Sequence, residues 1–530
     1  MSSLLRSNVT VAAGTAVSRI TGLARVAVLG IVLSQGPVTD AYDQANGTPN
    51  MIYELLLGGV LSATLVPLFT RLHDDDDDEA TSAVISVGII VLAAITAVAV
   101  LAAPLIFRMY SLLTSNSVDA DQYRTAGTML ARIFLVQIFF YGLNAMGTAL
   151  LNARRRFFAA AWAPTLSNVA IIASLLLVPG IMHQRVPQLD DVINNSRLLW
   201  TLGLGATVGI AVMAFALLPA LVQANVHFRF KPSFSNPAVK SLRSLSMWAL
   251  GYVLANQVAI VVIRNLLRGG SGNEDAYTKA FTWFMLPHGL LAVSIATTFL
   301  PELSSAIKRG DRQKVLDRSS FGIRLIALVT LPAGLGLFVL RRAIVGAAFQ
   351  HGKFTAANAL NTSRALAGFA LGLVGFSVYL FVLRVFYAHQ DARTPFIINV
   401  GENVLNIALA FLLVGRFGLL GLGLAFGLAY IIAAIWALQV LRYKLPSFPL
   451  QDVLASLWRM AVAGIVMAEA VWLVARAVGA NSGPGAVVRL VVSTIVGVAV
   501  YVAVLSVLQS PELDDLRSRI RPAPTTTEAE

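Results

Sequence analysis

The chain has 530 residues, of which 57% are hydrophobic and 13% are charged, and its mean hydropathy of +0.74 is too high for a water-soluble protein. Its formal net charge of +13 is ascribed to loops beside a membrane and to an anionic ligand, not to nucleic acid. It contains no cysteine, and its six histidines lack any metal-binding spacing, so we expect neither disulfides nor a metal site.

Apolar runs of roughly 20 residues, the length that crosses about 30 Å of hydrocarbon, recur along the whole chain. They predict an all-α polytopic membrane protein with about fourteen transmembrane helices. The first is expected to be a retained membrane helix, because no small-residue cleavage site follows it. The Gly368-xxx-Gly372 and Gly423-xxx-Gly427 spacings favour close packing between helices. The helices are expected at residues 8–33, 45–71, 80–108, 124–151, 160–180, 198–223, 243–266, 276–303, 319–347, 360–388, 395–415, 418–441, 453–478 and 485–508.

Lysine and arginine residues in the loops set the predicted orientation. With the N-terminus inside, the inner loops hold about twenty of these residues and the outer loops roughly a dozen. This bias predicts a multi-pass protein of the plasma membrane with both termini in the cytoplasm. The acidic stretch HDDDDDEA (residues 73–80) then lies in the first cytoplasmic loop, either as a solvated loop or as a cation-binding or regulatory segment.

The two halves of the chain resemble each other. VLSATLVPLFTRL (60–72) matches SIATTFLPELSSA (294–306) at an offset of 234, and a second segment matches at 235, with Asn168 on Asn403. An offset of six helices predicts two lobes of the same orientation, which in transporters enclose the substrate near mid-membrane. We therefore expect an N-lobe at 1–225 (helices 1–6), a C-lobe at 240–443 (helices 7–12), helices 13 and 14 at 450–508 and a disordered cytoplasmic tail at 509–530.

Two arginines within the first predicted helix are the main candidates for substrate binding. Arg19 and Arg25 lie six residues apart in SRITGLARVAVLG, where a charge at mid-bilayer costs from about 3 to over 10 kcal/mol. Six positions turn about 120° around a helix, and Gly22 between them could bend it so that both arginines border one cavity. Such a pair suits a diphosphate, because guanidinium binds phosphate bidentately and keeps its charge. The alternative is two arginines that snorkel or pair structurally.

Three further charged residues accompany the arginines as candidates. Asp40 lies at the outer start of helix 2, where it pairs with a cavity arginine, acts as a gate or is a plain loop carboxylate. Glu54 lies within helix 2, where a charge needs a partner. Lys279, near the outer end of helix 8, is either a snorkelling lysine or the cation that faces the arginine pair from the second lobe.

Polar residues inside helix 11 form a second candidate site. Asn399, Glu402 and Asn403 have spacings of three and four residues, which pair Asn399 with each of the other two on one helix face. Their oxygens either hold a monovalent cation or belong to an interhelical hydrogen-bond network.

Enzyme motifs fail in this chain. GAAFQHGKF resembles a phosphate loop, but five residues separate Gly346 from Gly352 where the motif needs four, and Phe354 replaces its Ser or Thr. We therefore expect no enzyme and no cofactor apart from coupling to a monovalent cation. Transport would be driven by an ion gradient, the membrane potential or substrate flux.

Several segments resemble the MurJ/MviN family, namely SRITGLARVAVLG, TDAYDQANGTPN, GGVLSATLVPLF, ALLNARRRFFAAAWAPTLSNV and FLPELS. The resemblance covers essentially all of residues 1–508, and the composition and YELLLGGVLSA are similar to actinobacterial members. These proteins are proposed lipid II flippases of the multidrug/oligosaccharidyl-lipid/polysaccharide exporter superfamily. The resemblance implies a fourteen-helix fold, a central cationic cavity, a groove beside helices 13 and 14 for the polyprenyl tail, and alternating access. Its partners would be lipid II (an undecaprenyl-diphosphate-linked muropeptide), membrane lipids and the cell-wall synthesis machinery.

The resemblance also assigns site residues. Arg19 and Arg25 match the family's two essential first-helix arginines, and Asp40 matches the acidic residue that opens helix 2. Many members have arginines in helix 2 where this chain has Tyr53 and Glu54. The family arginine of helix 8 falls at Thr282, and Lys279 is the candidate replacement. The predicted substrate-binding set is thus Arg19, Arg25, Asp40, Tyr53, Glu54 and Lys279.

Two other functions stay open from the sequence. A multidrug or cation antiporter of the same superfamily would favour acidic residues in the cavity and twelve helices. A non-transporting scaffold for cell-wall synthesis would tolerate replacement of Arg19 and Arg25.

Overall fold

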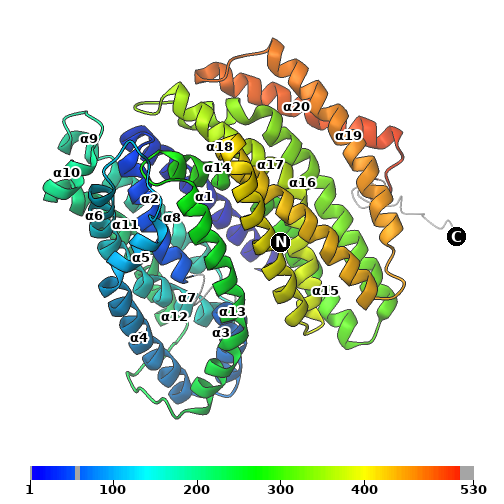
Figure 1. The fold of residues 1–530 in the computed structure, drawn as a ribbon. Helices are drawn as coiled ribbons and strands as arrows, with labels where there is room; N and C mark the ends of the chain where they lie inside the picture. The colour runs from blue at the N-terminus through cyan, green and yellow to red at the C-terminus, as the bar shows by residue number, and fades with distance from the viewer. Residues whose placement is uncertain (1–2, 54–59, 514–530) are drawn as a thin grey trace. The chain divides into compact units, whose positions relative to one another are not determined.

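The computed structural model describes residues 3–53 and 60–513, and every regular element in these ranges is helical (Figure 1). The only β-type pairing within the same ranges is an isolated bridge between Thr114 and Gly269. Among the described residues, 11 helices are long and apolar enough to cross a membrane. The prediction of an all-α polytopic membrane protein is confirmed.

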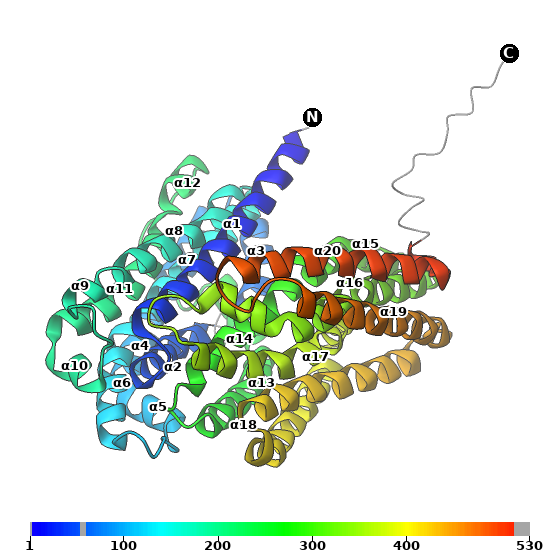
Figure 2. The same cartoon turned by 90° about the horizontal axis from the view of Figure 1, so that it is seen from above.

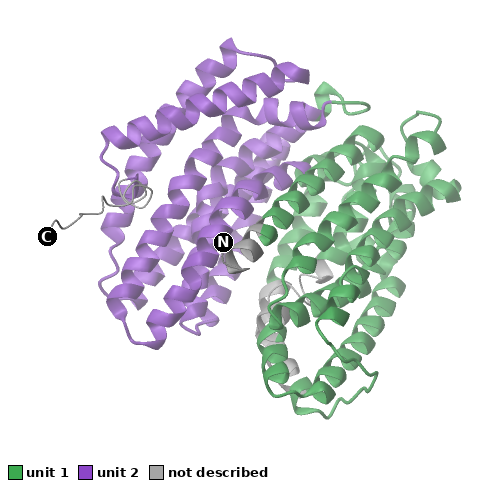
Figure 3. Cartoon of the chain, turned by 180° about the vertical axis from the view of Figure 1, so that it is seen from behind, with its two compact units in different colours: residues 1–278, 351–358 green, residues 279–350, 359–530 purple. Residues whose placement is uncertain are grey.

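The chain divides into two compact units (Figure 3). Unit 1 comprises Met1–Thr278 and His351–Asn358, and unit 2 comprises Lys279–Gln350 and Ala359–Glu530. The boundary thus passes through α14 (Asn273–Pro287). It differs from the boundary between the predicted six-helix lobes, which stay a prediction.

Unit 1 contains a bundle in which α8 packs against both α1 and α11, and α2 packs against α6. Its core is aromatic and aliphatic, with Phe107, Tyr123 and Phe134 fully buried. Short polar side chains start several of its helices: the Asp119 carboxylate, for example, accepts a hydrogen bond from the Gln122 amide at 2.7 Å. The helices are α1 (Ser3–Leu33), α2 (Pro37–Tyr53), α3 (Val60–Asp74), α4 (Asp78–Leu101), α5 (Ala103–Tyr110), α6 (Ala120–Phe134), α7 (Gln137–Ala153), α8 (Phe158–Leu175), α9 (Val178–Ile181), α10 (Leu189–Asn194), α11 (Ser196–Phe215), α12 (Leu218–Gln223) and α13 (Pro237–Leu266).

In unit 2, α16 packs against α19 and α20, which run side by side (Figure 2). A cluster of aromatic rings joins α14, α17 and α18, with Phe284 edge-on to Phe426 at 5.4 Å between ring centroids. The remaining elements are a π-helical turn (His288–Ala292), α15 (Val293–Lys308), α16 (Arg312–Phe349), α17 (Ala356–Ala388), α18 (Arg393–Lys444), α19 (Leu450–Ala477) and α20 (Gly483–Val507).

Glycines bring α17 and α18 into backbone contact. A Cβ built on Gly368 would lie 2.4 Å from the Leu424 nitrogen, and one built on Gly372 would lie 2.3 Å from the Gly427 Cα. No larger residue fits at such a crossing without moving the helices apart. The predicted role of the two glycine spacings is confirmed.

The predicted count of fourteen helices is not reproduced by the 11 candidate spans in the described ranges. Two predicted helices, 395–415 and 418–441, lie in the single element α18, whose backbone breaks at Gly418 (φ 54°, ψ −129°). Predicted helix 45–71 falls on α2, on α3 and on the residues between them that are not described. Predicted helix 243–266 is α13, which is not among the candidate spans.

Helix boundaries repeat with the offset found in the sequence. Helix α3 ends at Asp74 and α15 ends at Lys308, 234 residues later. Helix α8 begins at Phe158 and α18 begins at Arg393, 235 residues later. The duplication therefore extends beyond the matched letters to the positions at which helices start and stop.

Contacts between loops fall into two sets within the units. Segments predicted on the outer side contact each other, as where the Ser34 hydroxyl donates to the Lys353 carbonyl at 2.9 Å. Segments predicted on the inner side do the same, as where Lys231 pairs with Glu79 at 2.6 Å and Lys444 pairs with Asp391. This segregation supports the predicted alternation of helices, while the side that faces the cytoplasm stays a prediction.

The described end of the chain is ordered where we expected disorder from residue 509. Residues 511–513 are helical, and the Glu512 side chain is buried, with Oε1 accepting hydrogen bonds from Ser456 at 2.7 Å and from Arg324 at 3.1 Å. A buried carboxylate with charge-assisted partners holds a short segment that composition alone marks as polar tail. The expectation for residues 514–530 lies outside the described residues.

Candidate functional site

The predicted arginine pair lies on α1, which remains helical through Gly22. Arg19 is exposed and Arg25 is partly buried. In the part of the chain that the structure describes, neither guanidinium has a hydrogen bond or ion pair with a protein group. Two cations without a protein counter-ion on a membrane helix are a favourable environment for an anionic group.

The rotation of α1 is set by α8, through a residue that sequence reasoning singled out only as a repeat position. The Asn168 amide nitrogen donates to the Ser18 carbonyl and to the Thr21 hydroxyl, each at 3.1 Å. A Cβ on Gly22 would lie 3.6 Å from the same nitrogen, so the two helices meet closely there. Because Ser18 and Thr21 flank Arg19, these bonds fix the direction in which the arginines leave the helix.

Asp40 lies at the first turn of α2, is 0% exposed, and binds backbone amides rather than a side-chain cation. Its Oδ2 accepts from the Gly270 nitrogen at 3.0 Å and the Gly272 nitrogen at 2.7 Å, and its Oδ1 accepts from the Asp275 nitrogen at 3.0 Å. We refer to these three bonds as the Asp40 clasp. The clasp places a carboxylate at the N-terminus of α14, where the helix dipole favours negative charge.

The clasp is extended by Arg264 at the end of α13. Its Nη1 donates to the Gln44 carbonyl at 3.0 Å, and its Nε lies 3.6 Å from a carboxylate oxygen of the buried Glu274. Its guanidinium also lies over the Tyr110 ring, 5.2 Å from the centroid. Glycine is required at position 47 for this packing, because a Cβ there would collide with the guanidinium.

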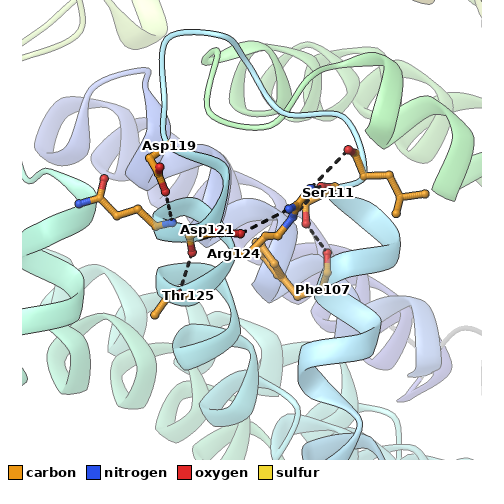
Figure 4. Close-up of polar contacts among 8 residues, drawn as sticks. Phe107, Ser111, Asp119, Asp121, Arg124 and Thr125 are labelled. Atoms are coloured by element: carbon orange, nitrogen blue, oxygen red, sulfur yellow. Dashed lines mark hydrogen bonds and ion pairs between the residues drawn. The ribbon is translucent and has the colours of Figure 1, made fainter.

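The α5–α6 loop is tied into the same assembly. Gln44 donates through its amide to the Tyr110 carbonyl and accepts from the Tyr123 hydroxyl at 2.8 Å. Arg124 of α6 donates twice to the Ser111 carbonyl, at 3.2 and 2.9 Å, and the Ser111 hydroxyl donates to the Phe107 carbonyl (Figure 4). The segment between α13 and α14 is therefore held by α2 and by this loop together.

Sequence reasoning missed the residues that Asp40 binds, although a signal was present. The triplet Asp-Ala-Tyr occurs at residues 40–42 and again at 275–277, at the repeat offset of 235. The structure brings the two copies together, because Asp40 accepts from the Asp275 amide. The Gln35 amide in turn donates to the Asp275 carboxylate at 3.4 Å.

The other predicted substrate-binding residues are placed as follows. Lys279 is 1% exposed in α14, so protein encloses its side chain and the ammonium does not snorkel to an interface. It belongs to unit 2, whereas Arg19 and Arg25 belong to unit 1. Tyr53 is the last residue of α2, and its side chain is outside the described part; Glu54 is outside the described residues altogether.

The helix 11 residues lie buried in the first half of α18. The Asn403 amide donates to the Asn399 carbonyl at 2.9 Å. Glu402 is 2% exposed, and neither of its carboxylate oxygens has a hydrogen-bond partner in the protein. No group of three or more His, Cys, Asp or Glu side chains suited to a metal ion occurs among the described residues.

Comparison with known proteins identifies the family. Residues 30–493 match the family model described as lipid II flippase MurJ. The chain belongs to the MurJ family. A lipid II flippase MurJ from Burkholderia cenocepacia is 29% identical over 434 residues, covering 80% of this chain and 81% of the relative. A probable lipid II flippase MurJ from Bdellovibrio bacteriovorus is 26% identical over 533 residues, covering 98% of this chain and 97% of the relative.

Solved structures show the same fold. A lipid II flippase MurJ in an inward closed conformation matches with a TM-score of 0.76 at 22% identity, covering 97% of this chain and all of that one (100%). An inward-facing MATE family multidrug resistance transporter of the MOP superfamily matches with a TM-score of 0.66 at 16% identity, covering 81% of this chain and 95% of that one. The MurJ fold and its place among these transporters, expected from the sequence, are confirmed.

Proposed function

We propose that this MurJ family chain moves lipid II from the cytoplasmic to the outer face of the plasma membrane by alternating access. The observation that carries the proposal is the match of residues 30–493 to the flippase family. A transporter rather than an enzyme also agrees with the helical fold and its 11 candidate spans in the described ranges. Lipid II is the substrate, and the cell-wall synthesis machinery is a proposed partner.

Arg19 and Arg25 are proposed to bind the diphosphate of the substrate. Their support is the absence of a protein counter-ion for either guanidinium in the described residues. A diphosphate offers several acceptor oxygens, and each planar guanidinium can take two of them. Lys279 is proposed to supply the cation of the second lobe, and Tyr53 and Glu54 to complete the pocket wall.

The Asp40 clasp is proposed to be the gate at the outer face. Three charge-assisted hydrogen bonds hold the start of α14 to the start of α2. The substrate can leave outward only after these bonds break, so the clasp sets the balance between closed and open outer states. Of the alternatives considered for Asp40, a gate agrees better with its amide partners than pairing with an arginine does.

Asn399, Glu402 and Asn403 are proposed as a site for a monovalent cation that couples to transport. The support is a buried carboxylate in α18 without a hydrogen-bond partner, because an intramembrane carboxylate needs a proton or a cation nearby. A multidrug or cation antiporter would use such a group as well, and the MATE neighbours share the fold. The arginine pair distinguishes the two functions, since it favours an anionic substrate.

Depletion of the protein in its host, with rescue by variants, tests the function. Wild type should restore exposure of lipid II on the outer face, whereas Arg19→Ala and Arg25→Ala should be present in the membrane and fail. Arg25→Lys should also fail, because lysine keeps the charge and loses bidentate geometry. Arg309→Ala, at an exposed arginine after α15, is the matched control and should rescue. Unchanged lipid II exposure after depletion would refute the substrate, and rescue by both alanine variants would refute the role of the arginines.

The proposed cytoplasmic position of both termini is tested separately. Because the chain has no cysteine, single cysteines report topology without background labelling. Asp119→Cys should react with a membrane-impermeant maleimide in intact cells, and Arg309→Cys only after permeabilisation. The reverse pattern would invert the predicted orientation.

A further inference from the structure

A cavity of about 730 Å³ lies in unit 2, away from the arginine pair and the clasp. One wall is the first third of α16, residues 313–324, and the opposite wall is made by Ser447 and Pro449 of the α18–α19 loop and by Asp452 of α19. Arg312 fastens one end by donating to the Pro446 carbonyl at 2.7 Å. Arg324 fastens the other through its 3.1 Å ion pair with Glu512.

Two buried donors on the cavity wall have no partner in the protein. Ser320 is 2% exposed, and its hydroxyl makes no hydrogen bond. The Nε of Arg324 is likewise buried and unpaired, although the Nη1 of the same guanidinium binds Glu512. An unmet buried donor on a charged group is costly, so the cavity is built to receive acceptor atoms.

The charges around these donors point the same way. Lys314 is partly buried on the cavity wall, and no ion pair is described for it. Two of the nearby carboxylates are already engaged: Asp311 accepts from the Lys314 backbone amide at 3.1 Å, and Asp317 accepts from Gln313 at 3.0 Å. Helix α19 begins beside the cavity without a side-chain cap, so its first amides add positive potential.

We propose that this cavity binds a phosphoryl group, held by the Lys314 ammonium, the Ser320 hydroxyl and the Nε–H of Arg324. A phosphoryl oxygen accepts hydrogen bonds from all three groups, whereas a bound cation would leave the Arg324 donor unmet and face its charge. The cavity lies where two candidate spans begin, α16 and α19, the level at which phospholipid head groups occur. The phosphoryl group therefore comes from a lipid head group or from free phosphate.

Glu512 is a positioning residue for this site. Burial acts to raise the pKa of its carboxyl, but hydrogen bonds from Ser456 and Ser510 and the charge of Arg324 hold it below the ordinary value. The resulting carboxylate takes one edge of the guanidinium and leaves Nε turned to the cavity wall.

Binding of water-soluble probes to the purified full chain in detergent tests the proposal. Dihexanoyl phosphatidylglycerol is the lipid probe, dihexanoylglycerol is its match without phosphate, and inorganic phosphate is the free anion. Lys314→Ala and Ser320→Ala should each weaken binding of a phosphate-bearing probe about tenfold, the usual effect of losing one such hydrogen bond. Lys308→Ala, which removes an exposed lysine of α15 that does not line the cavity, should leave it unchanged.

The outcomes separate the sources and the sites. Binding of the lipid probe alone identifies a head group, and equal dependence on the same residues for inorganic phosphate identifies free phosphate. The dependence must persist in an Arg19→Ala, Arg25→Ala background, so that failure of the flippase proposal does not affect it. No saturable binding of either phosphate-bearing probe, or equal binding by all variants, would overturn the phosphoryl site and leave water as the partner of the buried donors.

Discussion

Replacing Asp40 with asparagine is expected to loosen the clasp that holds the start of α14. The carboxylate accepts two amides on Oδ2 and one on Oδ1. Asparagine has a single carbonyl oxygen, so its best orientation keeps the Gly270 and Gly272 bonds and turns an NH₂ group toward the Asp275 amide. One buried donor is then left unmet, and the other two bonds lose their charge assistance.

The magnitude follows from these three bonds. An unmet buried donor costs about 1–3 kcal/mol, and the change from a charged to a neutral acceptor costs roughly 1 kcal/mol for each remaining bond. Removing a buried negative charge that Glu274 repels offsets part of this. The net loss is about 3 kcal/mol in the free energy that keeps the clasp closed, which corresponds to an increase of about 100-fold in opening.

Hydrogen–deuterium exchange of the purified protein measures this opening directly. The amides of Gly270, Gly272 and Asp275 should exchange about 100-fold faster in Asp40→Asn than in wild type. Asp119→Asn is the matched control, because it alters the single capping bond to Gln122 and asparagine caps helices equally well. Wild-type exchange at the three amides in Asp40→Asn would refute the reasoning that the carboxylate closes this end of the protein.

Three further predictions concern other contacts. Asn168→Ala should reduce rescue in the depletion assay at unchanged membrane abundance, because it removes the bonds that orient α1; full rescue would show that α8 does not orient the arginines. Gly372→Val should lower the thermal unfolding temperature by the equivalent of roughly 1–3 kcal/mol, because its side chain meets the Gly427 backbone, whereas Gly336→Ala, with open space around it, should not; equal stability of the two variants would contradict the packing argument. Burial acts to raise the pKa of Asp391, but hydrogen bonds from Lys444 and Thr394 lower it to about 2, so its stabilising contribution is present above the ordinary pKa of 3.8 and is lost as the pH falls toward 2. Asp391→Asn should therefore lower the unfolding temperature at pH 6 but not at pH 2, and an equal difference at both values would count against the pairing.

The sequence by itself determined the class of the protein and much of its architecture. Apolar run length specifies membrane helices because only a helix satisfies its own backbone hydrogen bonds in hydrocarbon. The repeat offset was readable because Pro67 and Pro301, and Asn168 and Asn403, occupy equivalent places in duplicated helices. Arg19 and Arg25 were recognisable because a charge within an apolar run is too costly to lack a purpose.

Only the tertiary structure decided which groups meet. Asp40 and the amides of Gly270 and Gly272 lie 230 and 232 residues apart, and backbone donors leave no trace in side-chain patterns. The enclosure of Lys279 was equally hidden, because a lysine near a helix end looks the same whether neighbours cover it or solvent does. The order at Glu512 depends on Arg324 and Ser456, which reach it from two other helices. Helix formation is local and can be read from a window of residues, whereas these contacts depend on how the helices pack.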